Sequence, residues 1–260
     1  MPVITLRPDE RQPNTWWLVL NRPQQLNALS TQLLQELQAA LVQVAGDRRV
    51  RALILAASGR VFCAGADLKT LRALAGDVGQ IDQYMDHFNT VVDTLAGLPI
   101  PTVAAIQGGC YGGGVSLTLA CDFRIATEEC TFALPSARLG VLYTKHDIAR
   151  LMRAVGHGWA CRMLLAAESC DAQAAQANGL VHWLCSDSRL EAVSREKGSY
   201  LAQLSLASIG HSKYWLNRLS GVEGVSEQLD WGSSTDVTTG LQSQAKEGHP
   251  SFAWHPETDA

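Results

Sequence analysis

The chain has 260 residues, of which 47% are hydrophobic, and its formal net charge is -4. This length and this hydrophobic content are enough for one domain with a large hydrophobic core, followed by a short additional segment. The chain has no cluster of basic residues interleaved with aromatic ones, so we do not expect it to bind nucleic acid. The N-terminus lacks a basic segment followed by an apolar one, so we expect no secretory signal and a cytoplasmic location.

Strands and helices alternate along the first half of the chain. In order, the pattern predicts a strand over 16–20, a helix over 31–44, a strand over 50–57, a helix after the turn at 62–69, a helix over 80–95, a strand over 101–107, a helix over about 113–121 and a strand over 123–126. Helices then dominate, over 148–155, 159–167, 171–178 and from about 198 onward. The alternation predicts a layered α/β fold.

The most informative segment is the 28-residue stretch 94–121, which carries no charge. A run of this length could span a bilayer, but its prolines and glycines divide it into a strand, a glycine turn and a small-residue helix. The turn contains Gly112, Gly113 and Gly114. Bare backbone N–H groups at the start of a helix favour an oxyanion or a phosphate.

Seven cysteines are present, an odd number without the paired spacing of a disulfide framework or a zinc site. We expect them to be reduced and mostly buried. Cys63 and Cys110 flank the glycine-rich segments, but an apolar surrounding raises the pKa of a thiol and argues against a nucleophile. The histidines show no metal-ligand spacing, so we expect no metal site.

Four motifs in series resemble the enoyl-CoA hydratase/isomerase (crotonase) superfamily, and the resemblance covers roughly residues 3–260. They are Leu20-Asn21-Arg22-Pro23 with Leu26-Asn27-Ala28-Leu29, then Phe62 to Lys69, then Gly112-Gly113-Gly114, then Ala175 to Val181. The resemblance implies a spiral of ββα units in a core over 1–197. It also implies a C-terminal helical region over 198–260 that assembles trimers, often paired into hexamers.

The same resemblance implies a coenzyme A thioester as ligand or substrate, with no further cofactor. Its carbonyl oxygen would lie between the backbone N–H groups of Ala66 and Gly113, which form an oxyanion hole. The segments that resemble the CoA site contain Gln25, Leu26, Asn27, Ala64, Asp67 and Leu68. Asp67 is also a candidate N-cap for the next helix. Lys246 and Phe252 fall where some relatives contact the neighbouring subunit's nucleotide.

The departures from the family pattern concern the acid and base. Hydratases of this family carry two glutamates where this chain has Ser116 and Ser136, and other branches use an aspartate where it has Thr144. A serine or threonine does not titrate near neutral pH. Because general acid–base help is worth roughly 10²- to 10⁴-fold in rate for each group, we expect poor hydration of enoyl-CoA.

A polar segment, Tyr143 to Asp147, offers substitutes in the region that faces the acyl group in relatives. His146 could act as a base near neutral pH, and Asp147 could do so if desolvated. The competing interpretation makes Asp147 the N-cap of a helix starting at Ile148, with His146 and Lys145 in solvent.

Two functions therefore stay open. The runs 134–140, 155–158 and 163–165 resemble homologues that lack both glutamates and bind fatty acyl-CoA without hydrating it. The first function is an acyl-CoA-binding protein with a vestigial active site. The alternative is an active isomerase, hydrolase or hydratase that uses Asp147 or His146 as its base.

Overall fold

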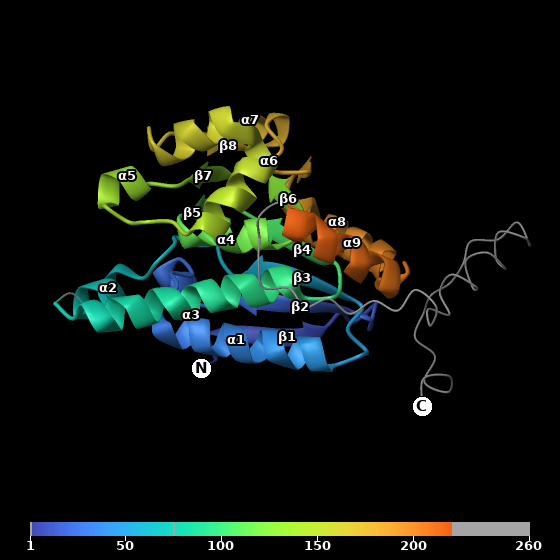
Figure 1. Cartoon of the computed structure of the whole chain (residues 1–260). Coiled ribbons are helices and arrows are strands. Elements are labelled where there is room, and N and C mark those ends of the chain that lie inside the picture. Colours follow the sequence, from blue (N-terminus) through green and yellow to red (C-terminus); the bar gives the residue numbers. More distant parts are fainter. Residues whose placement is uncertain (1, 75, 220–260) are drawn as a thin grey trace, which may run out of the picture.

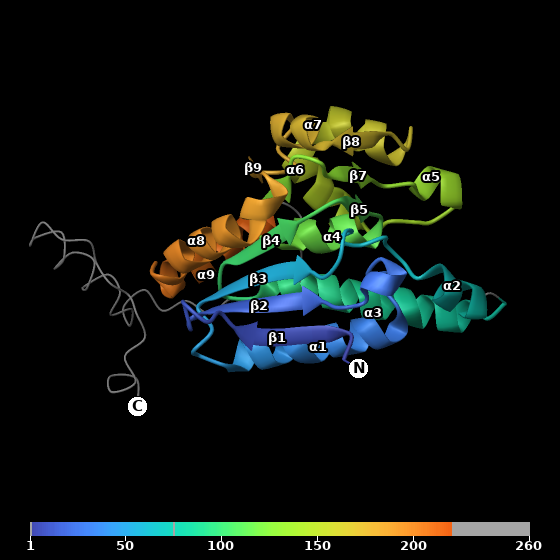
Figure 2. The ribbon, with the colours of Figure 1, turned by 180° about the vertical axis from the view of Figure 1, so that it is seen from behind.

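The computed structural model describes residues 2–74 and 76–219, and these form a six-stranded sheet with helices on both faces (Figures 1 and 2). In spatial order its strands are β1 (Ile4–Pro8), β2 (Thr15–Leu20), β3 (Ala52–Ala57), β4 (Thr102–Ile106), β6 (Phe123–Thr127) and β9 (Trp183–Cys185). β1 pairs antiparallel with β2, and the following pairs are parallel. A second sheet joins β5 (Gly109–Tyr111), β7 (Thr131–Ala133) and β8 (Ser169–Asp171).

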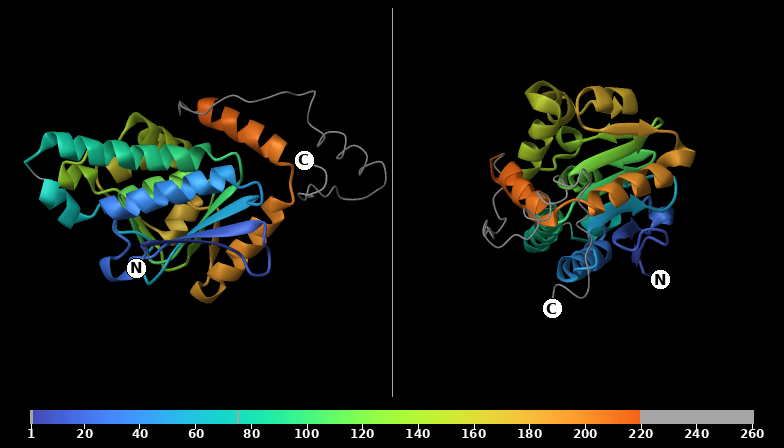
Figure 3. Two further views of the ribbon diagram at one scale, coloured as in Figure 1. Left: turned by 90° about the horizontal axis from the view of Figure 1, so that it is seen from below. Right: turned by 90° about the vertical axis from the view of Figure 1, so that its right-hand side faces the viewer.

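The side chains of the main sheet alternate between two cores. Leu18 and Leu20 of β2 belong to the large core beneath α1 (Thr31–Gly46) and α3 (Val78–Gly97), two helices that lie side by side (Figure 3). Trp17 of β2 belongs to a smaller core that α8 (Leu190–Ala202) covers from the opposite face. This period-two alternation is what a strand buried on both faces produces.

α4 (Gly113–Ala120) lies at the centre of the molecule, between α3 and α6 (Lys145–Leu164) (Figure 1). α6 bends at Gly156, where φ is 71°, so its two arms have separate directions. The other helices are α2 (Leu68–Leu74), α5 (Ser136–Leu139), α7 (Ala172–Ala177) and α9 (Leu206–Leu219). Between residues 2 and 219, apart from residue 75, no helix combines the length and the apolar composition needed to cross a membrane.

The α/β class and the predicted elements up to residue 178 are confirmed, with boundaries shifted by a few residues. The uncharged run divides as predicted, into β4 and α4, although β5 between them was not expected. The predicted helices over 148–155 and 159–167 are the two arms of α6, which begins three residues earlier. The expected domain boundary after residue 197 falls within α8, and the division itself stays a prediction. Lys246 and Phe252 lie outside the described residues.

Candidate functional site

Two loops meet beside the N-terminus of α4. Tyr111 N donates to Cys63 O at 2.9 Å, so the segment before α4 runs next to the segment that follows Phe62. A Cβ atom placed on Gly65, where φ is +89°, would lie 2.9 Å from Tyr111 O. Glycine is therefore required at this position for the two loops to approach each other.

Each loop presents a backbone N–H that the fold does not use. Within the described part of the chain, the N–H groups of Ala66 and Gly113 donate no hydrogen bond, whereas the adjacent Gly112 N donates to Ala133 O at 2.9 Å. Gly113 is the first residue of α4, so its N–H has no acceptor inside the helix. Such N–H groups at the positive end of a helix favour a negatively charged oxygen.

Ser116, one turn further along α4, is buried and lines a small cavity of about 10 Å³ together with Tyr143 and Asp147. This volume holds about one water molecule. The remaining walls are apolar and come from α4, the β7–α5 connection and α6: Leu119, Leu134, Ile148, Leu151 and Leu164. The structure thus brings Ser116, one of the two predicted glutamate positions, next to Asp147, one of the two predicted substitute bases.

The carboxylate of Asp147 is only 6% exposed. Its Oδ2 accepts from Thr144 Oγ1 at 2.8 Å. Its Oδ1 lies 3.9 Å from Arg150 Nη1 and has no hydrogen-bond partner among the described residues. A buried carboxylate oxygen without a hydrogen bond is costly, and a catalytic role and a bound water are two ways to account for it.

The interpretation of Asp147 as an N-cap is wrong. α6 begins at Lys145, and Thr144 is its N-cap, because Thr144 Oγ1 accepts from Asp147 N at 3.1 Å. Asp147 is therefore the third residue of the helix, in the place where a capping box carries its acidic residue. Thr144 therefore positions Asp147, because its hydroxyl hydrogen-bonds both the backbone N–H and the carboxylate of that residue.

The two predicted substitute bases, His146 and Asp147, lie in different surroundings. His146 Nδ1 lies 3.4 Å from Asp93 Oδ2 of α3, and the same carboxylate accepts from Arg150 Nη2. His146 does not line the Ser116 cavity. Lys145 is exposed, as expected.

Ser136 lies next to this cavity. It is the first residue of α5, it is buried, and its Oγ donates to Leu164 O at 3.4 Å. Leu164 is part of the cavity wall. The two positions predicted to have lost glutamates, Ser116 and Ser136, thus both adjoin the residues of this cavity wall.

The predicted CoA segment runs along the outer side of the first loop. Ala64 N donates to Leu26 O at 3.0 Å, and Gln25, Leu26 and Leu68 are exposed. The side chain of Asn27, in contrast, is fully buried and accepts from Arg22 N at 2.8 Å. It holds this loop in shape.

Asp67 caps α2, as one of its two interpretations predicts. Its Oδ1 accepts from Lys69 N at 2.9 Å and from Thr70 N at 3.3 Å. Its Oδ2 pairs with Arg22 Nη1 at 3.0 Å. Although burial opposes ionisation, the hydrogen bonds from Arg22 and from the backbone lower the pKa of this carboxyl overall.

The two cysteines beside the loops are unsuited to nucleophilic catalysis. Burial raises the pKa of the Cys63 thiol to about 12, and it raises the pKa of Cys110 as well. All seven cysteines are free thiols, as expected.

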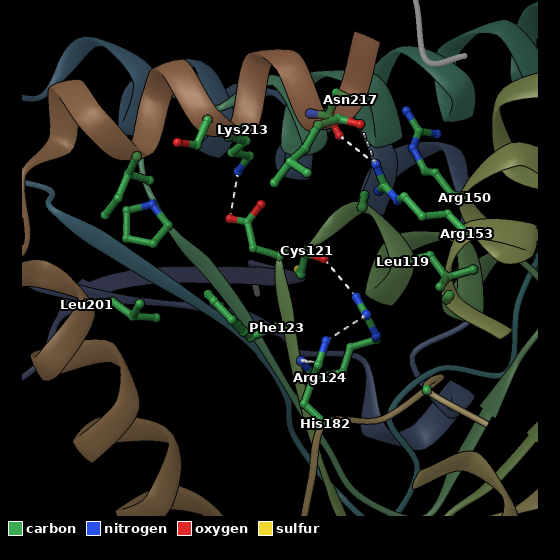
Figure 4. A pocket seen from close by; sticks show the side chains of 18 of the residues that line it. Leu119, Cys121, Phe123, Arg124, Arg150, Arg153, His182, Leu201, Lys213 and Asn217 are labelled. Carbon is green, nitrogen blue, oxygen red and sulfur yellow. Dashed lines mark hydrogen bonds and ion pairs between the residues drawn. The ribbon is translucent and has the colours of Figure 1, made fainter. Parts of the chain in front are cut away.

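A larger cavity of about 530 Å³ lies at the C-terminal end of α4, among α6, α8, α9 and the start of β6 (Figure 4). Its charged groups are occupied by one another and by the backbone. Lys213 Nζ pairs with Asp122 Oδ2 at 2.8 Å, and Arg124 donates to the carbonyls of Leu180 and Cys121. None of the residues predicted for the site lines this cavity, so it is separate from the candidate site.

Sequence reasoning placed Tyr143 only within the polar segment that faces the acyl group in relatives, and it gave no role to Arg150. A signal for Tyr143 was present, because an apolar residue before the N-cap often packs against the fourth residue of the helix. Tyr143 and Ile148 stand in these two positions and line the same cavity. The signal for Arg150 was its spacing of three residues from Asp147, which suits an ion pair on a helix.

Comparison with known proteins identifies the family of this chain. A model of the enoyl-CoA hydratase/isomerase family matches residues 10–256. The chain therefore belongs to this family, the crotonase superfamily that its motifs resemble.

Three relatives illustrate the similarity. "Probable enoyl-CoA hydratase" of Rhizobium meliloti is 36% identical over 209 residues, which is 80% of each chain. "Probable enoyl-CoA hydratase echA6" of Mycobacterium tuberculosis is 34% identical over 239 residues, which is 90% of this chain and 93% of the relative. The crystal structure of an enoyl-CoA hydratase/carnithine racemase from Magnetospirillum magneticum superimposes with a TM-score of 0.87 at 27% identity and covers 97% of this chain and 96% of its own.

Proposed function

We propose that this protein binds acyl-CoA thioesters, with the thioester oxygen between the backbone N–H groups of Ala66 and Gly113. The observation that carries the proposal is the pair of N–H groups without an acceptor on two loops that Gly65 brings together. An oxygen that gains negative charge as a thioester becomes an enolate suits two such donors at the start of a helix.

Efficient hydration is not expected of this site. The hydratase reaction adds water to a carbon–carbon double bond and needs groups that give and take protons. The residues at the two glutamate positions, Ser116 and Ser136, are buried serines, and Ser136 is engaged with the carbonyl of Leu164. The main function that we infer is therefore acyl-CoA binding with poor or no hydratase activity.

A second candidate function follows from Asp147. Its buried carboxylate shares the cavity of Ser116, which supports an isomerase, hydrolase or hydratase that uses Asp147 as its base. His146 is less suited to this role, because its ring lies against Asp93 and outside the cavity.

The exposed residues Gln25, Leu26 and Leu68, with Ala64, would border the nucleotide and pantetheine of the bound CoA. We also propose a trimer or hexamer. Tyr200 of α8 and Leu219 of α9 are exposed apolar side chains at the C-terminal end of the described chain, which supports contacts with another subunit. Light scattering that gives a monomer at micromolar concentration would contradict this.

The experiment that separates the two functions combines turnover and binding. Crotonyl-CoA and longer enoyl-CoAs are assayed for hydration, and a saturated acyl-CoA is titrated by calorimetry. Binding with hydration far below about 10 per second, a typical enzyme rate, supports the first function. Hydration at such rates would contradict it, and absence of binding would contradict both.

A further inference from the structure

The hydroxyl of Tyr143 lies at the corner where the two loops meet. A Cβ atom placed on Gly112 would lie 3.7 Å from Tyr143 Oη and 3.6 Å from the Cα of Gly65. Gly112 directly precedes Gly113, and Gly65 directly precedes Ala66. The phenol therefore lies beside Gly112, the residue before Gly113, on the side of the second loop that faces Gly65 of the first loop.

The fold makes no use of this hydroxyl. Within the described residues Tyr143 Oη takes part in no hydrogen bond, although the ring is packed against the main core. Burial, and then the charge of Asp147, raise the pKa of Tyr143. The phenol thus stays protonated near neutral pH and keeps a proton to donate.

We propose that Tyr143 is a catalytic residue that donates a hydrogen bond to the thioester oxygen, as a third donor beside the N–H groups of Ala66 and Gly113. This rests on the proposed binding of an acyl-CoA and, for the reaction, on the second candidate function, in which Asp147 is the base. A neutral hydroxyl held in a partly desolvated site stabilises a developing oxyanion without having to lose its proton. The two residues of this cavity then have different roles. Tyr143 donates a hydrogen bond to the carbonyl oxygen, and Asp147 takes a proton from the adjacent carbon.

The simplest reaction of this arrangement is reversible enolisation. The Asp147 carboxylate takes a proton from C2 of the acyl group, and the electron pair of that C–H bond forms the C1=C2 double bond. The carbonyl π pair moves onto the oxygen, where Tyr143 and the two N–H groups hold it. The reverse step returns a proton from Asp147 to C2. In D2O the carboxyl exchanges its proton with solvent, so C2 gains deuterium without any other reactant.

The alternative is that Tyr143 only fills space between α6 and the core. Phenylalanine would then serve equally well, since it keeps the ring and removes only the hydroxyl. Tyr111→Phe is the matched control, because the Tyr111 hydroxyl is hydrogen-bonded to Thr131 Oγ1 at 2.8 Å and does not line the cavity.

The test uses butyryl-CoA labelled at the carbonyl carbon, with wild type, Tyr143→Phe and Tyr111→Phe. Infrared difference spectra report the stretching frequency of the bound carbonyl, which falls as donors polarise it. We expect the frequency to move back toward that of free butyryl-CoA in Tyr143→Phe and deuterium exchange at C2 to slow at least 100-fold, with affinity changed less than tenfold. Tyr111→Phe should match wild type in both measurements.

An unchanged carbonyl frequency and exchange rate in folded, ligand-bound Tyr143→Phe would overturn the role of Tyr143 and leave acyl-CoA binding intact. Absence of binding to wild type would overturn the proposed function instead. If Tyr143→Phe fails to fold, Tyr143→Met removes the hydroxyl with a flexible side chain of similar bulk and is compared in the same way.

Discussion

Ser116 of α4 and Asp147 of α6 line the same cavity, although they come from different helices and distant parts of the chain. Thr144 holds the Asp147 carboxylate through one oxygen, which leaves the other without a hydrogen bond. A carboxylate from another helix thus lies beside Ser116, the position at which the family resemblance predicts a hydratase glutamate.

Replacing Asp147 with Asn should abolish most of the base activity of the site. The amide keeps the size of the side chain but cannot take a proton, so we expect deuterium exchange at C2 of butyryl-CoA to fall at least 100-fold. NMR of the recovered thioester measures the exchange. His146→Asn is the control, because His146 lies outside the cavity and should leave the rate within about threefold. A rate unchanged in Asp147→Asn would exclude Asp147 as the base.

Restoring the two glutamates should succeed only if the charge of Asp147 is removed as well. Ser116→Glu places a second carboxylate beside Asp147 in a cavity that holds about one water molecule, so repulsion and crowding both oppose it. We expect Ser116→Glu with Ser136→Glu to lower the melting temperature and to hydrate crotonyl-CoA weakly. Adding Asp147→Asn should recover stability and raise hydration. Equal stability with and without Asp147→Asn would contradict the proximity that the structure shows.

Cysteine labelling should follow burial. Cys63 and Cys121 are buried with pKa values raised to about 12, so at a pH of about 8 roughly one thiol in 10⁴ is ionised. Cys161 is partly exposed. We expect iodoacetamide to modify Cys161 in the native protein and to spare Cys63 and Cys121, as read by mass spectrometry of peptides. Prompt modification of Cys63 without unfolding would show that the first loop opens.

The stability of the protein should decrease in mild acid because of His182. Burial, and then the charge of Arg124, lower the pKa of His182 to about 4, and its Nδ1 accepts from Arg124 N at 3.0 Å only when neutral. In the unfolded chain, the pKa of His182 is near its usual value of 6.5. The free energy of unfolding therefore falls as the pH drops through the window from about 6.5 to about 4, and it is unaffected above.

Urea unfolding at a pH of about 7 and a pH of about 5 measures this effect. Because part of the His182 ring is exposed to solvent, we expect its contribution to be about 1 kcal/mol. His182→Asn should lose less stability than wild type between these two pH values. An equal loss in both proteins would assign the pH dependence to other groups.

The sequence predicted the parts of the site that local rules decide. A glycine turn before an apolar helix predicted bare N–H groups at the start of α4, whereas the choice of Ala66 and Gly113 as the two donors came from the family resemblance. The place of Asp147 depends on the start of α6, and an error of three residues there turns a buried carboxylate in the first turn into a cap. The direction of Tyr143 depends on how α6 packs on α4, which no local pattern encodes.

The fold shows the same division. β3 and β4 are continuous apolar runs bounded by turn residues, which allowed their prediction, whereas β1 was not predicted. β5, β7, β8 and β9 have three residues each, which is too short for a period to be visible, and they form only because they pair with one another or with β6.

The central claim is that the thioester carbonyl is held by the N–H groups of Ala66 and Gly113. Substituting Gly113 tests this poorly, because a Cβ atom there would lie 2.8 Å from Leu29 Cδ1 and would disturb the core. Changing the ligand leaves the protein intact. Calorimetric titration of the wild type compares butyryl-CoA with S-butyl-CoA, the thioether that lacks only the carbonyl oxygen. We predict that butyryl-CoA binds at least tenfold more tightly, a difference of about 1.4 kcal/mol. Equal affinities would contradict the account.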